Sequence, residues 1–577
     1  MIFTLAPDSR TRPTGERRPT ATVPHVTPAD PFWAPRLAQL RDHTLPVLRE
    51  RLEHHGAMEA VTRLASRPQD RPRRRAHHGS DADLAGWIEA ACLAGVPHLV
   101  EPFVEPIVAA QQADGYWSTE LGVDPAGPRR YDRIEDGAEH RAAARFIDAA
   151  IAHHGATGDL RLLDVAIRWA DHLLVTFGPG RDERVPAVPV GLEGALVHLG
   201  AATGNDRYVA HARWVCERRL ALTGTDLEHV ALAGDATAAV LGAEAIATIA
   251  EATGDDRWRA AAERLFDSLV GAHLHPTGNV GTARSDGTIG GEFHVPTHGP
   301  HAHSCAAVAT LGFAQAVWRL TGRADALDLV ELSLYNAVAA GTGSDGESWM
   351  AAQSHTDGSA RSSWLDPSCC PTALARAVAA VPSLVADVGP DGHLRIHLPL
   401  AARIVGGGWD VEVRSGYPWD ADVDLVVHEG PEGGRIAVRV PGWAGGRGHR
   451  DITASPRLRL LVRPEWWEAD PRVTAGRGSV FLRRGPIVYC VEGPADGPDL
   501  RSVVIVPGQP IEERDAPILA GGMRVLGLRG RVLPTGAGLY HRLGEAGVAH
   551  TEVELTAVPV AARANRGLER CTFFLRT

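Results

Sequence analysis

The stretch ATGNDRYVAHARWV, residues 202–215, holds the unit that decides the fold of the first part of the chain. It reads as the end of one helix, a Thr-Gly turn and the start of the next helix. The pattern recurs, with successive ATG turns 46 and 50 residues apart. A repeat of this length predicts stacked pairs of antiparallel helices. The related stretches begin at Ala156 (ATGDLRLLDVAIRWADHLL), Ala252 (ATGDDRWRAAAERLF) and Leu320 (LTGRADALDLVELSLYNAV).

Helical periodicity extends on both sides of these turns, from about residue 30 to residue 387. Leu241, Ala245 and Ile249 lie on one face of a predicted helix that ends at Gly254. A long irregular segment, residues 276–305, interrupts the repeat, and loops of that length usually carry function. We therefore expect the helix pairs to close into a toroid, with this loop at one mouth, rather than to form an open solenoid.

The last third of the chain has the period of β-strands. Apolar residues alternate in DVDLVVHEG (422–430) and RIAVRVPGW (435–443), and Gly/Pro turns follow about every 8–12 residues. This pattern predicts two antiparallel β-sandwiches in series, with a boundary near 500. The expected domains are a helical catalytic domain (1–390), a β-sandwich domain (391–500) and a second β-sandwich domain (501–577).

The bulk composition excludes several function classes. The net charge of −11 argues against a nucleic-acid binder. We find no apolar run of membrane-spanning length, and the N-terminal residues lack the apolar core of a secretion signal. We expect a cytoplasmic protein with reduced thiols and no membrane partner. Its oligomeric state stays open, with a homodimer as the candidate assembly.

The cysteines fall into two groups. Their number is odd, seven, and their spacing is scattered, which excludes a disulfide framework. One group lies in apolar surroundings and is interpreted as buried thiols: Cys92, Cys216, Cys490 and Cys571. The other group lies in loops rich in Pro, Ser and His: Cys305 in HGPHAHSCAA and the adjacent pair Cys369 and Cys370 in WLDPSCCPTALARA.

These loop cysteines, together with a nearby histidine, form a candidate zinc site. His303, Cys305, Cys369 and Cys370 supply the four nitrogen and sulfur ligands that a tetrahedral zinc ion prefers. A thiolate beside a divalent cation has a lowered pKa and attacks electrophilic carbon. In the alternative interpretation, the histidines belong to an ordinary polar loop and the cysteines bind nothing.

A series of motifs along nearly the whole chain resembles one family, the β-L-arabinofuranosidases of glycoside hydrolase family 127. The resemblance implies an (α/α)6 barrel followed by β-sandwiches. It also implies a zinc ion held by three cysteines and a glutamate, with retention of the anomeric configuration. By this resemblance Cys369 is the nucleophile, and Cys305 and Cys370 are zinc ligands. The motifs include DPFWAPR (30–36), QQADGYW (111–117), LYNAV (334–338), CCPTALAR (369–376), GYPWD (416–420) and RRGPIVYCVEG (483–493).

The chain departs from the family pattern at the catalytic positions. His303 stands where the family has its glutamate ligand, and Gly287 stands where it has its acid/base glutamate. Glycine cannot transfer a proton, so we expect a displaced carboxylate to replace it. Glu292 is the first candidate and Asp286 the second; the alternative is that Glu292 is an ordinary solvated acid.

The predicted sugar pocket departs from the family as well. Arg145, Pro189 and Asp235 replace family histidines, and Trp364 next to the cysteines is a further expected substrate contact. Arg145 indicates an anionic group on the substrate, and Asp235 indicates a hydroxyl or an amine.

The resulting hypothesis is a zinc-dependent retaining glycosidase with a cysteine nucleophile. Its substrate is expected to be a small carbohydrate or glycosylated metabolite bearing an acidic or deoxy furanoside, not a plain β-L-arabinofuranoside. Two alternatives stay open. One is a non-hydrolase zinc enzyme, such as a lyase, an isomerase or a ring-opening enzyme, in specialised metabolism. The other is a non-catalytic sugar-binding protein.

Overall fold

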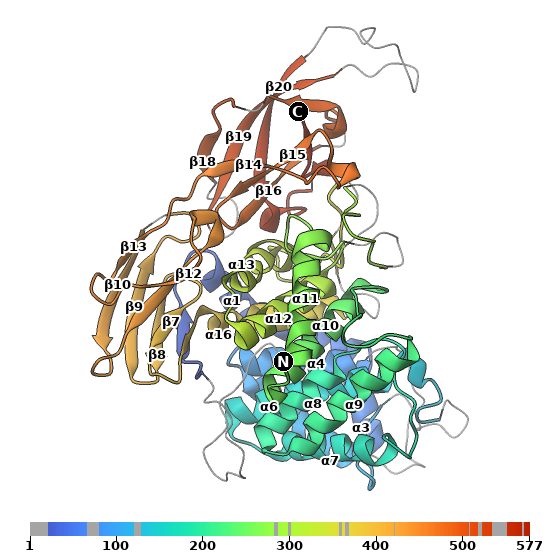
Figure 1. The fold of residues 1–577 in the computed structure, drawn as a ribbon. Coiled ribbons are helices and arrows are strands. Elements are labelled where there is room, and N and C mark those ends of the chain that lie inside the picture. The colour runs from blue at the N-terminus through green and yellow to red at the C-terminus, as the bar shows by residue number, and fades with distance from the viewer. Residues whose placement is uncertain are drawn as a thin grey trace, which may run out of the picture.

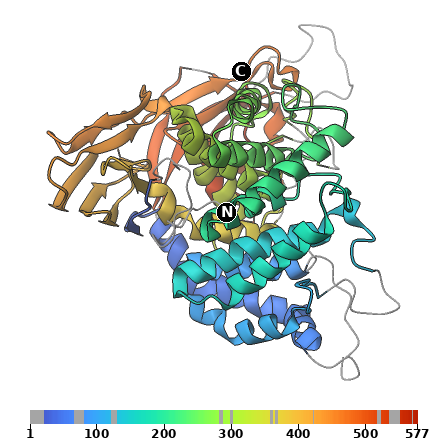
Figure 2. The same cartoon turned by 60° about the horizontal axis from the view of Figure 1, so that its bottom comes forward.

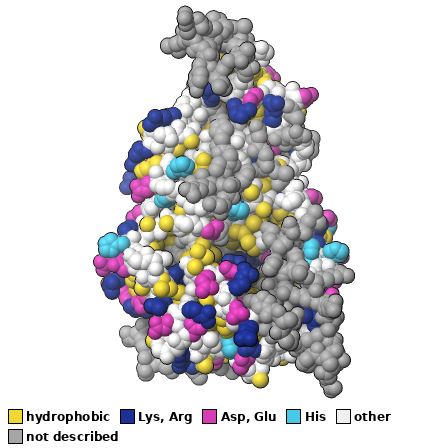
Figure 3. Space-filling model, turned by 90° about the vertical axis from the view of Figure 1, so that its right-hand side faces the viewer, with side chains coloured by type: hydrophobic (Ala, Val, Ile, Leu, Met, Phe, Trp, Pro, Cys, Tyr) yellow, Lys and Arg dark blue, Asp and Glu magenta, His cyan; other side chains and the backbone are white. Residues whose placement is uncertain are grey.

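The computed structural model describes residues 21–65, 80–119, 129–281, 287–297, 302–356, 361–363, 369–420, 422–494, 496–506, 508–516, 522–533, 551–567 and 570–577. A helical part extends to Val385, and the β-sheets formed by the later residues lie along one side of it (Figures 1 and 2). Among the described residues on the face shown in Figure 3, acidic and basic side chains are interspersed.

A ring of helices forms the centre of the helical part. In the described part of the chain, six helices pack each against the next, and the last packs against the first. The contact between α15 and α4 closes the ring, which an open solenoid would not do. The ring helices are α4 (Ser80–Leu93), α6 (Ala138–Thr157), α8 (Leu192–Thr203), α10 (Ala236–Thr253), α12 (Ser304–Thr321) and α15 (Cys370–Ala379).

Further helices accompany the ring, among them α7 on α6, α9 on α8, α11 on α10 and α13 on α12. Their bounds are α1 (Trp33–Gln39), α2 (Leu45–His54), α3 (Ala57–Ala65), α5 (Glu101–Ala110), α7 (Arg161–Thr176), α9 (Asp206–Leu222), α11 (Asp256–Ser268), α13 (Ala324–Ser333), α14 (Ala339–Gly341) and α16 (Val381–Val385). Contrary to the sequence expectation, one described helix, α10, is long and apolar enough by composition to cross a membrane. Its position in the ring, packed against α8, α11 and α12, accounts for that composition.

The repeated Thr-Gly turns have one physical explanation. In the turn after α8, the Thr203 hydroxyl donates to the Leu199 carbonyl, and Gly204 ends the helix at φ +70°, a conformation that favours glycine. The side chain of Asn205 then accepts from the Arg207 amide and caps α9. The equivalent glycines Gly158, Gly254 and Gly322 also adopt left-handed φ values.

The first β-sandwich consists of two sheets. Burial alternates along β9, as expected for a strand with one face in the core. The N-terminal strand β1 pairs with β8, a contact that sequence periodicity did not predict. One sheet has the order β1 (His25–Pro28), β8 (Ala402–Gly406), β9 (Trp409–Ser415), β10 (Asp422–Glu429), β13 (Arg457–Arg459). The other has the order β12 (Gly448–Asp451), β11 (Ile436–Val440), β7 (Leu394–Ile396), β6 (Ala386–Val388).

The C-terminal sheet differs from the predicted domain organisation. Its strands follow the order β14-β15-β22-β17-β19-β20-β16-β21, and β16 also pairs with β15, so the sheet closes on itself. The predicted boundary near 500 falls inside this sheet, because strands on both sides of it share hydrogen bonds. The bounds are β14 (Pro464–Glu468), β15 (Ser479–Arg484), β16 (Ile487–Gly493), β17 (Val503–Ile505), β18 (Glu512–Ala516), β19 (Met523–Val532), β20 (Thr551–Pro559), β21 (Arg570–Thr572) and β22 (Leu575–Arg576).

Buried polar contacts attach the sheets to the helices. Arg439 on β11 is fully buried and forms ion pairs with Asp328 and Glu331 of α13. Asn336, in the LYNAV stretch (334–338), donates to the Pro486 carbonyl at 2.8 Å and accepts from the Val488 amide at 2.7 Å. These contacts fix both sheet regions against the end of the helical repeat.

Candidate functional site

The predicted cysteine cluster forms at the start of two ring helices. Cys305 lies in the first turn of α12, and Cys369 and Cys370 begin α15. The Cys305 sulfur lies 3.0 Å from that of Cys369 and 3.2 Å from that of Cys370. All of these sulfurs lie within 4.8 Å of one another. Residues 64 positions apart therefore meet at one point, as the sequence predicted.

Local structure explains why the thiols converge. The short strands β2 (Ala302–His303) and β4 (Ala352–Gln353) pair immediately before α12. The Ser304 hydroxyl donates to the Met350 carbonyl, and the side chain of Gln353 donates to the Ser304 oxygen. Together these contacts hold the residue before Cys305 in a fixed position.

The electrostatics of the cluster single out Cys369. Hydrogen bonds from the Cys305 and Cys370 thiols hold the pKa of Cys369 well below its usual value, with further help from the positive charges of Arg145 and Arg141. Hydrogen bonds with Cys369 and Cys370 raise the pKa of Cys305 well above its usual value. Within the cluster, these shifts favour the thiolate form at Cys369 over the thiolate form at Cys305. The position of Cys369 at a helix N-terminus favours the same charge state.

His303 lies beside the cluster, but its ring nitrogens are not part of it. Among the described residues, the ligand atoms gathered within 4.8 Å at this place are the cysteine sulfurs. The imidazole of His303 lies beside Gly287, and the Asn279 side chain donates to the His303 carbonyl at 3.2 Å. The role of His303 as a fourth zinc ligand stays a prediction.

Gly287 lies against a carboxylate from another element. Its φ of +85° suits glycine, and a Cβ atom there would lie 3.0 Å from Oδ2 of Asp235 and 3.7 Å from the His303 ring. Asp235 caps α10 through its other oxygen, Oδ1, which accepts from the Ala238 amide at 2.9 Å. The Asp235 carboxylate therefore lies where a side chain at position 287 would begin.

Glu292 lies in different surroundings. It is exposed and lies close enough to His273 and Arg472 to interact with them electrostatically. Next to it, the amide of Phe293 donates to the Ala272 carbonyl, and the Arg472 guanidinium lies 3.7 Å from the centre of the Phe293 ring. The first contact holds the loop against the end of the α11 region, and the second brings it next to the connection between β14 and β15. Trp364 and Asp286, also expected at the site, lie outside the described residues.

Arg145 lies on α6, with its charge close enough to Cys369 to act on the pKa of that thiol. Burial lowers the pKa of Arg145, and the charge of Arg376 lowers it further, while Glu89 and Asp148 oppose this shift. Arg376 is itself paired with Glu89 at 2.8 Å, and both are buried. Among the described residues, Arg145 makes no hydrogen bond or ion pair.

The sequence reasoning missed several polar groups inside the ring. Glu89 and Arg376 form a buried pair, and Asp148 contacts His198 at 3.1 Å. The sequence feature that could have revealed them is a charged residue on the otherwise apolar face of a predicted ring helix. Such residues are costly to bury and are retained mainly where they bind or react.

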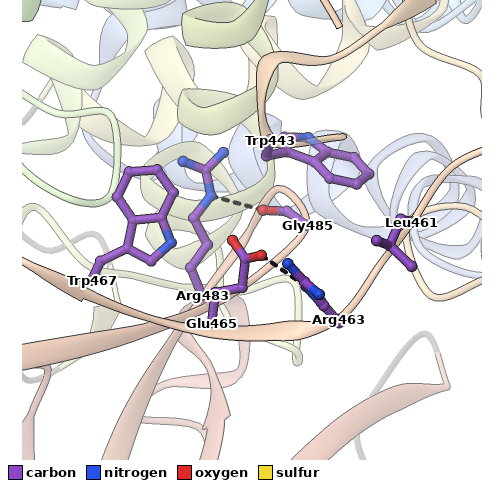
Figure 4. Close-up of a pocket in the computed structure, with 7 residues that line it drawn as sticks. All are labelled: Trp443, Leu461, Arg463, Glu465, Trp467, Arg483 and Gly485. Atoms are coloured by element: carbon purple, nitrogen blue, oxygen red, sulfur yellow. Dashed lines mark hydrogen bonds and ion pairs between the residues drawn. The ribbon is translucent and has the colours of Figure 1, made fainter. Parts of the chain in front are cut away.

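Two hollows lie on the β side, away from the cysteine cluster. A cavity of about 10 Å³ between Trp443, Trp467 and Arg483 has room for about one water molecule (Figure 4). A wider groove of about 520 Å³ is lined by Arg484 and Arg524, which pair with carboxylates. Neither is lined by residues of the cysteine cluster.

Comparison with known proteins identifies relatives of the whole chain. Residues 25–383 match the family model of the β-L-arabinofuranosidase GH127 catalytic domain, and residues 464–576 match the glycoside hydrolase family 127 C-terminal domain. A non-reducing end β-L-arabinofuranosidase from Bifidobacterium longum is 26% identical over 495 residues, which cover 71% of this chain and 75% of that protein.

Solved structures share the fold. A GH127 β-arabinofuranosidase superposes with a TM-score of 0.88 at 24% identity, covering 98% of each chain. A GH127 β-L-arabinofuranosidase from Geobacillus stearothermophilus superposes with a TM-score of 0.86 at 22% identity, covering 96% of this chain and 99% of that one. Because the catalytic family model spans well over half of the sequence, the chain belongs to glycoside hydrolase family 127.

Proposed function

We propose that this protein is a zinc-dependent retaining glycosidase whose nucleophile is the sulfur of Cys369, with the helical ring as an (α/α)6 barrel. Family membership supports glycoside hydrolysis of the β-L-arabinofuranosidase kind. The assignment of Cys369 as the nucleophile is supported by its place in the cluster of loop cysteines and by the pKa of its thiol, which lies well below the usual value.

The cysteine cluster fits a zinc ion by its chemistry. Sulfur ligands of a tetrahedral zinc ion lie roughly 3.8 Å apart, and the sulfurs here, at 3.0 and 3.2 Å, need only a small outward movement. Cys305, Cys369 and Cys370 would hold the ion, with His303 as the fourth ligand. When bound, zinc would keep the Cys369 sulfur deprotonated and oriented.

The reaction proceeds in two displacements. The Cys369 sulfur bonds to the anomeric carbon while the bond from that carbon to the leaving oxygen breaks, and a carboxylic acid protonates that oxygen. Water then attacks the same carbon, the carbon–sulfur bond breaks, and the carboxylate accepts the proton from water. Two inversions retain the anomeric configuration.

The proton carrier is Asp235. Its Oδ2 atom and the His303 ring both lie next to the place where a side chain at Gly287 would begin, and His303 precedes Cys305 by two residues. Glu292, the carboxylate expected from the sequence, is the second candidate because its loop contacts the connection between β14 and β15. Either group would act as acid in the first step and as base in the second.

The substrate carries an anionic group on its furanoside ring. Arg145 supports this assignment because its guanidinium lies near Cys369 without a hydrogen-bonding partner among the described residues. A guanidinium binds a carboxylate through two parallel hydrogen bonds. A plain arabinofuranoside lacks this group and is expected to be the poorer substrate.

Substitution of the nucleophile tests the proposal. Cys369→Ser is expected to lose turnover of aryl furanosides and furanuronosides by at least about 10³-fold, because an alkoxide does not form at neutral pH. Cys216→Ala, which removes a buried thiol of α9, is the matched control and keeps its activity. Full activity in Cys369→Ser would refute the thiolate mechanism.

A second candidate function is a non-hydrolase zinc enzyme on the same scaffold. The glycine at 287 favours it, since this loop position offers no proton-transferring side chain. Turnover in ¹⁸O-labelled water separates the two. A hydrolase places the label on the released sugar, whereas an isomerase or lyase releases an unlabelled product.

A further inference from the structure

A second group of metal-binding side chains lies away from the cysteine cluster. Glu101 begins α5, His153 lies in the last two turns of α6, and Asp159 follows the Thr-Gly turn after α6. One ligand atom from each lies within 4.8 Å of the other two. Residues from two helices and a turn thus place an imidazole and two carboxylates at one point.

His153 points to a ligand at this place. Its side chain is 1% exposed, and neither ring nitrogen has a hydrogen-bond partner among the residues that the structure describes. Buried polar atoms in folded proteins are nearly always hydrogen-bonded, so an imidazole with both nitrogens unpaired needs an explanation. At neutral pH an imidazole is mostly neutral and offers a lone pair to a cation.

The charges around His153 leave room for a cation. Arg161 binds Glu101 at 2.9 Å, Glu105 at 2.7 Å and Asp159 at 2.7 Å. One guanidinium therefore faces three carboxylates, which leaves an excess of negative charge. Each carboxylate has further lone pairs beyond those that Arg161 uses.

The position of His153 on α6 places the group of Glu101, His153 and Asp159 away from the cysteine cluster. Arg145, whose charge acts on Cys369, lies in the first half of α6, and His153 lies roughly 12 Å further along the helix axis. An ion at His153 would therefore not touch the cysteines. Its effect would be on the attachment of α5 to the turn between α6 and α7.

We propose that Glu101, His153 and Asp159 bind a divalent transition-metal cation, with zinc as the expected ion, that clamps the start of α5 to the α6–α7 turn. Imidazole combined with carboxylates suits zinc, cobalt and manganese. Zinc holds such ligands at roughly 2.0–2.2 Å, so the three atoms must approach one another slightly. The exposed side chain of Glu101 is the one placed to make that movement.

Metal binding by the full-length chain tests this proposal. Zinc is removed with a chelator and added back alone, to wild type and to Cys305→Ser, which disrupts the cysteine cluster. We expect Cys305→Ser to retain one bound zinc per chain. Cobalt in that variant should lack the near-ultraviolet charge transfer that thiolate ligands produce.

Glu101 and Glu105 lie on the same helix, α5, and both bind Arg161. Substituting each in turn therefore separates the loss of a metal ligand from the loss of an Arg161 partner. Glu101→Gln removes a ligand, whereas Glu105→Gln removes only a partner of Arg161. In the Cys305→Ser background, Glu101→Gln should weaken zinc binding roughly tenfold or more, and Glu105→Gln should leave it within about twofold.

The stability of the chain gives an independent readout. Zinc should raise the thermal midpoint of Cys305→Ser, and Asp159→Asn should abolish that increase while keeping an oxygen that accepts from the Arg161 amide. The proposal is overturned if Cys305→Ser binds no zinc or if Glu101→Gln and Glu105→Gln behave alike. If the cysteine cluster binds no zinc, the proposed function fails instead, and Cys305→Ser should then bind as much zinc per chain as the wild type.

Discussion

Cys369 and Arg145 are coupled through charge. The positive charge of Arg145 helps to lower the pKa of Cys369, after the hydrogen bonds from the neighbouring thiols. Arg145→Met should therefore raise that pKa, because the thiolate loses a stabilising charge. In metal-free protein, the midpoint of iodoacetamide alkylation at Cys369 should move to higher pH by about one unit. Arg168→Met on the exposed side of α7 is the control and should leave the midpoint unchanged.

If Asp235 carries the proton, substitutions of Asp235 and Glu292 should have different effects on kcat. Asp235→Asn keeps an oxygen to cap α10 but cannot donate the proton, so we expect kcat to fall by about 10²–10⁴-fold for substrates with poor leaving groups. Activated aryl glycosides, which need little protonation, should be affected less in the first step. Added azide should restore part of the turnover by replacing water in the second step. Glu292→Gln should leave kcat nearly unchanged; the reverse pattern would assign the role to Glu292.

The turn between α8 and α9 shows how single residues define an element. Gly204 adopts φ +70° with open space around its missing Cβ, so an alanine there is strained without any clash. Gly194, inside α8, has room for a Cβ that would lie 4.0 Å from His198. Gly204→Ala should destabilise the fold by about 1 kcal/mol, and Gly194→Ala should stabilise it by about 0.5 kcal/mol. Thermal midpoints measured by calorimetry should move in opposite directions; movement in the same direction would contradict this explanation.

Elements of this kind were predictable from the sequence because their signals are local. The Thr-Gly-Asx pattern around Asn205 specifies a helix end, a left-handed glycine and a new helix cap within six residues. The closure of the C-terminal sheet was not predictable in the same way. Its register depends on β15 and β16 pairing with strands far along the chain.

At the scale of the molecule, one buried arginine joins the sandwich to the helices. Arg439 is fully buried and pairs with Glu331, which is also fully buried. Arg439→Met leaves carboxylates uncompensated and should cost about 3–5 kcal/mol. Arg403→Met, which breaks the exposed pair with Asp410, should cost less than about 1 kcal/mol.

Calorimetry and limited proteolysis check this difference. The thermal midpoint of Arg439→Met should fall by several degrees, and the sheet region should be released by protease earlier than in Arg403→Met. Equal effects of the two substitutions would show that Arg439 does not attach the sandwich to α13.

The sequence alone determined the helical repeat, the change to β-strands and the group of loop cysteines. These follow from hydrophobic periodicity, turn chemistry and the placement of cysteines in polar segments, all of which act over a few neighbouring residues. Tertiary structure alone decided that Asp235 lies beside Gly287, that Glu292 lies near Arg472, and that His153 meets Glu101 and Asp159. Apart from His153 and Asp159, which are six positions apart, those contacts join residues fifty or more positions apart, and packing of the ring and the sheets sets their distances.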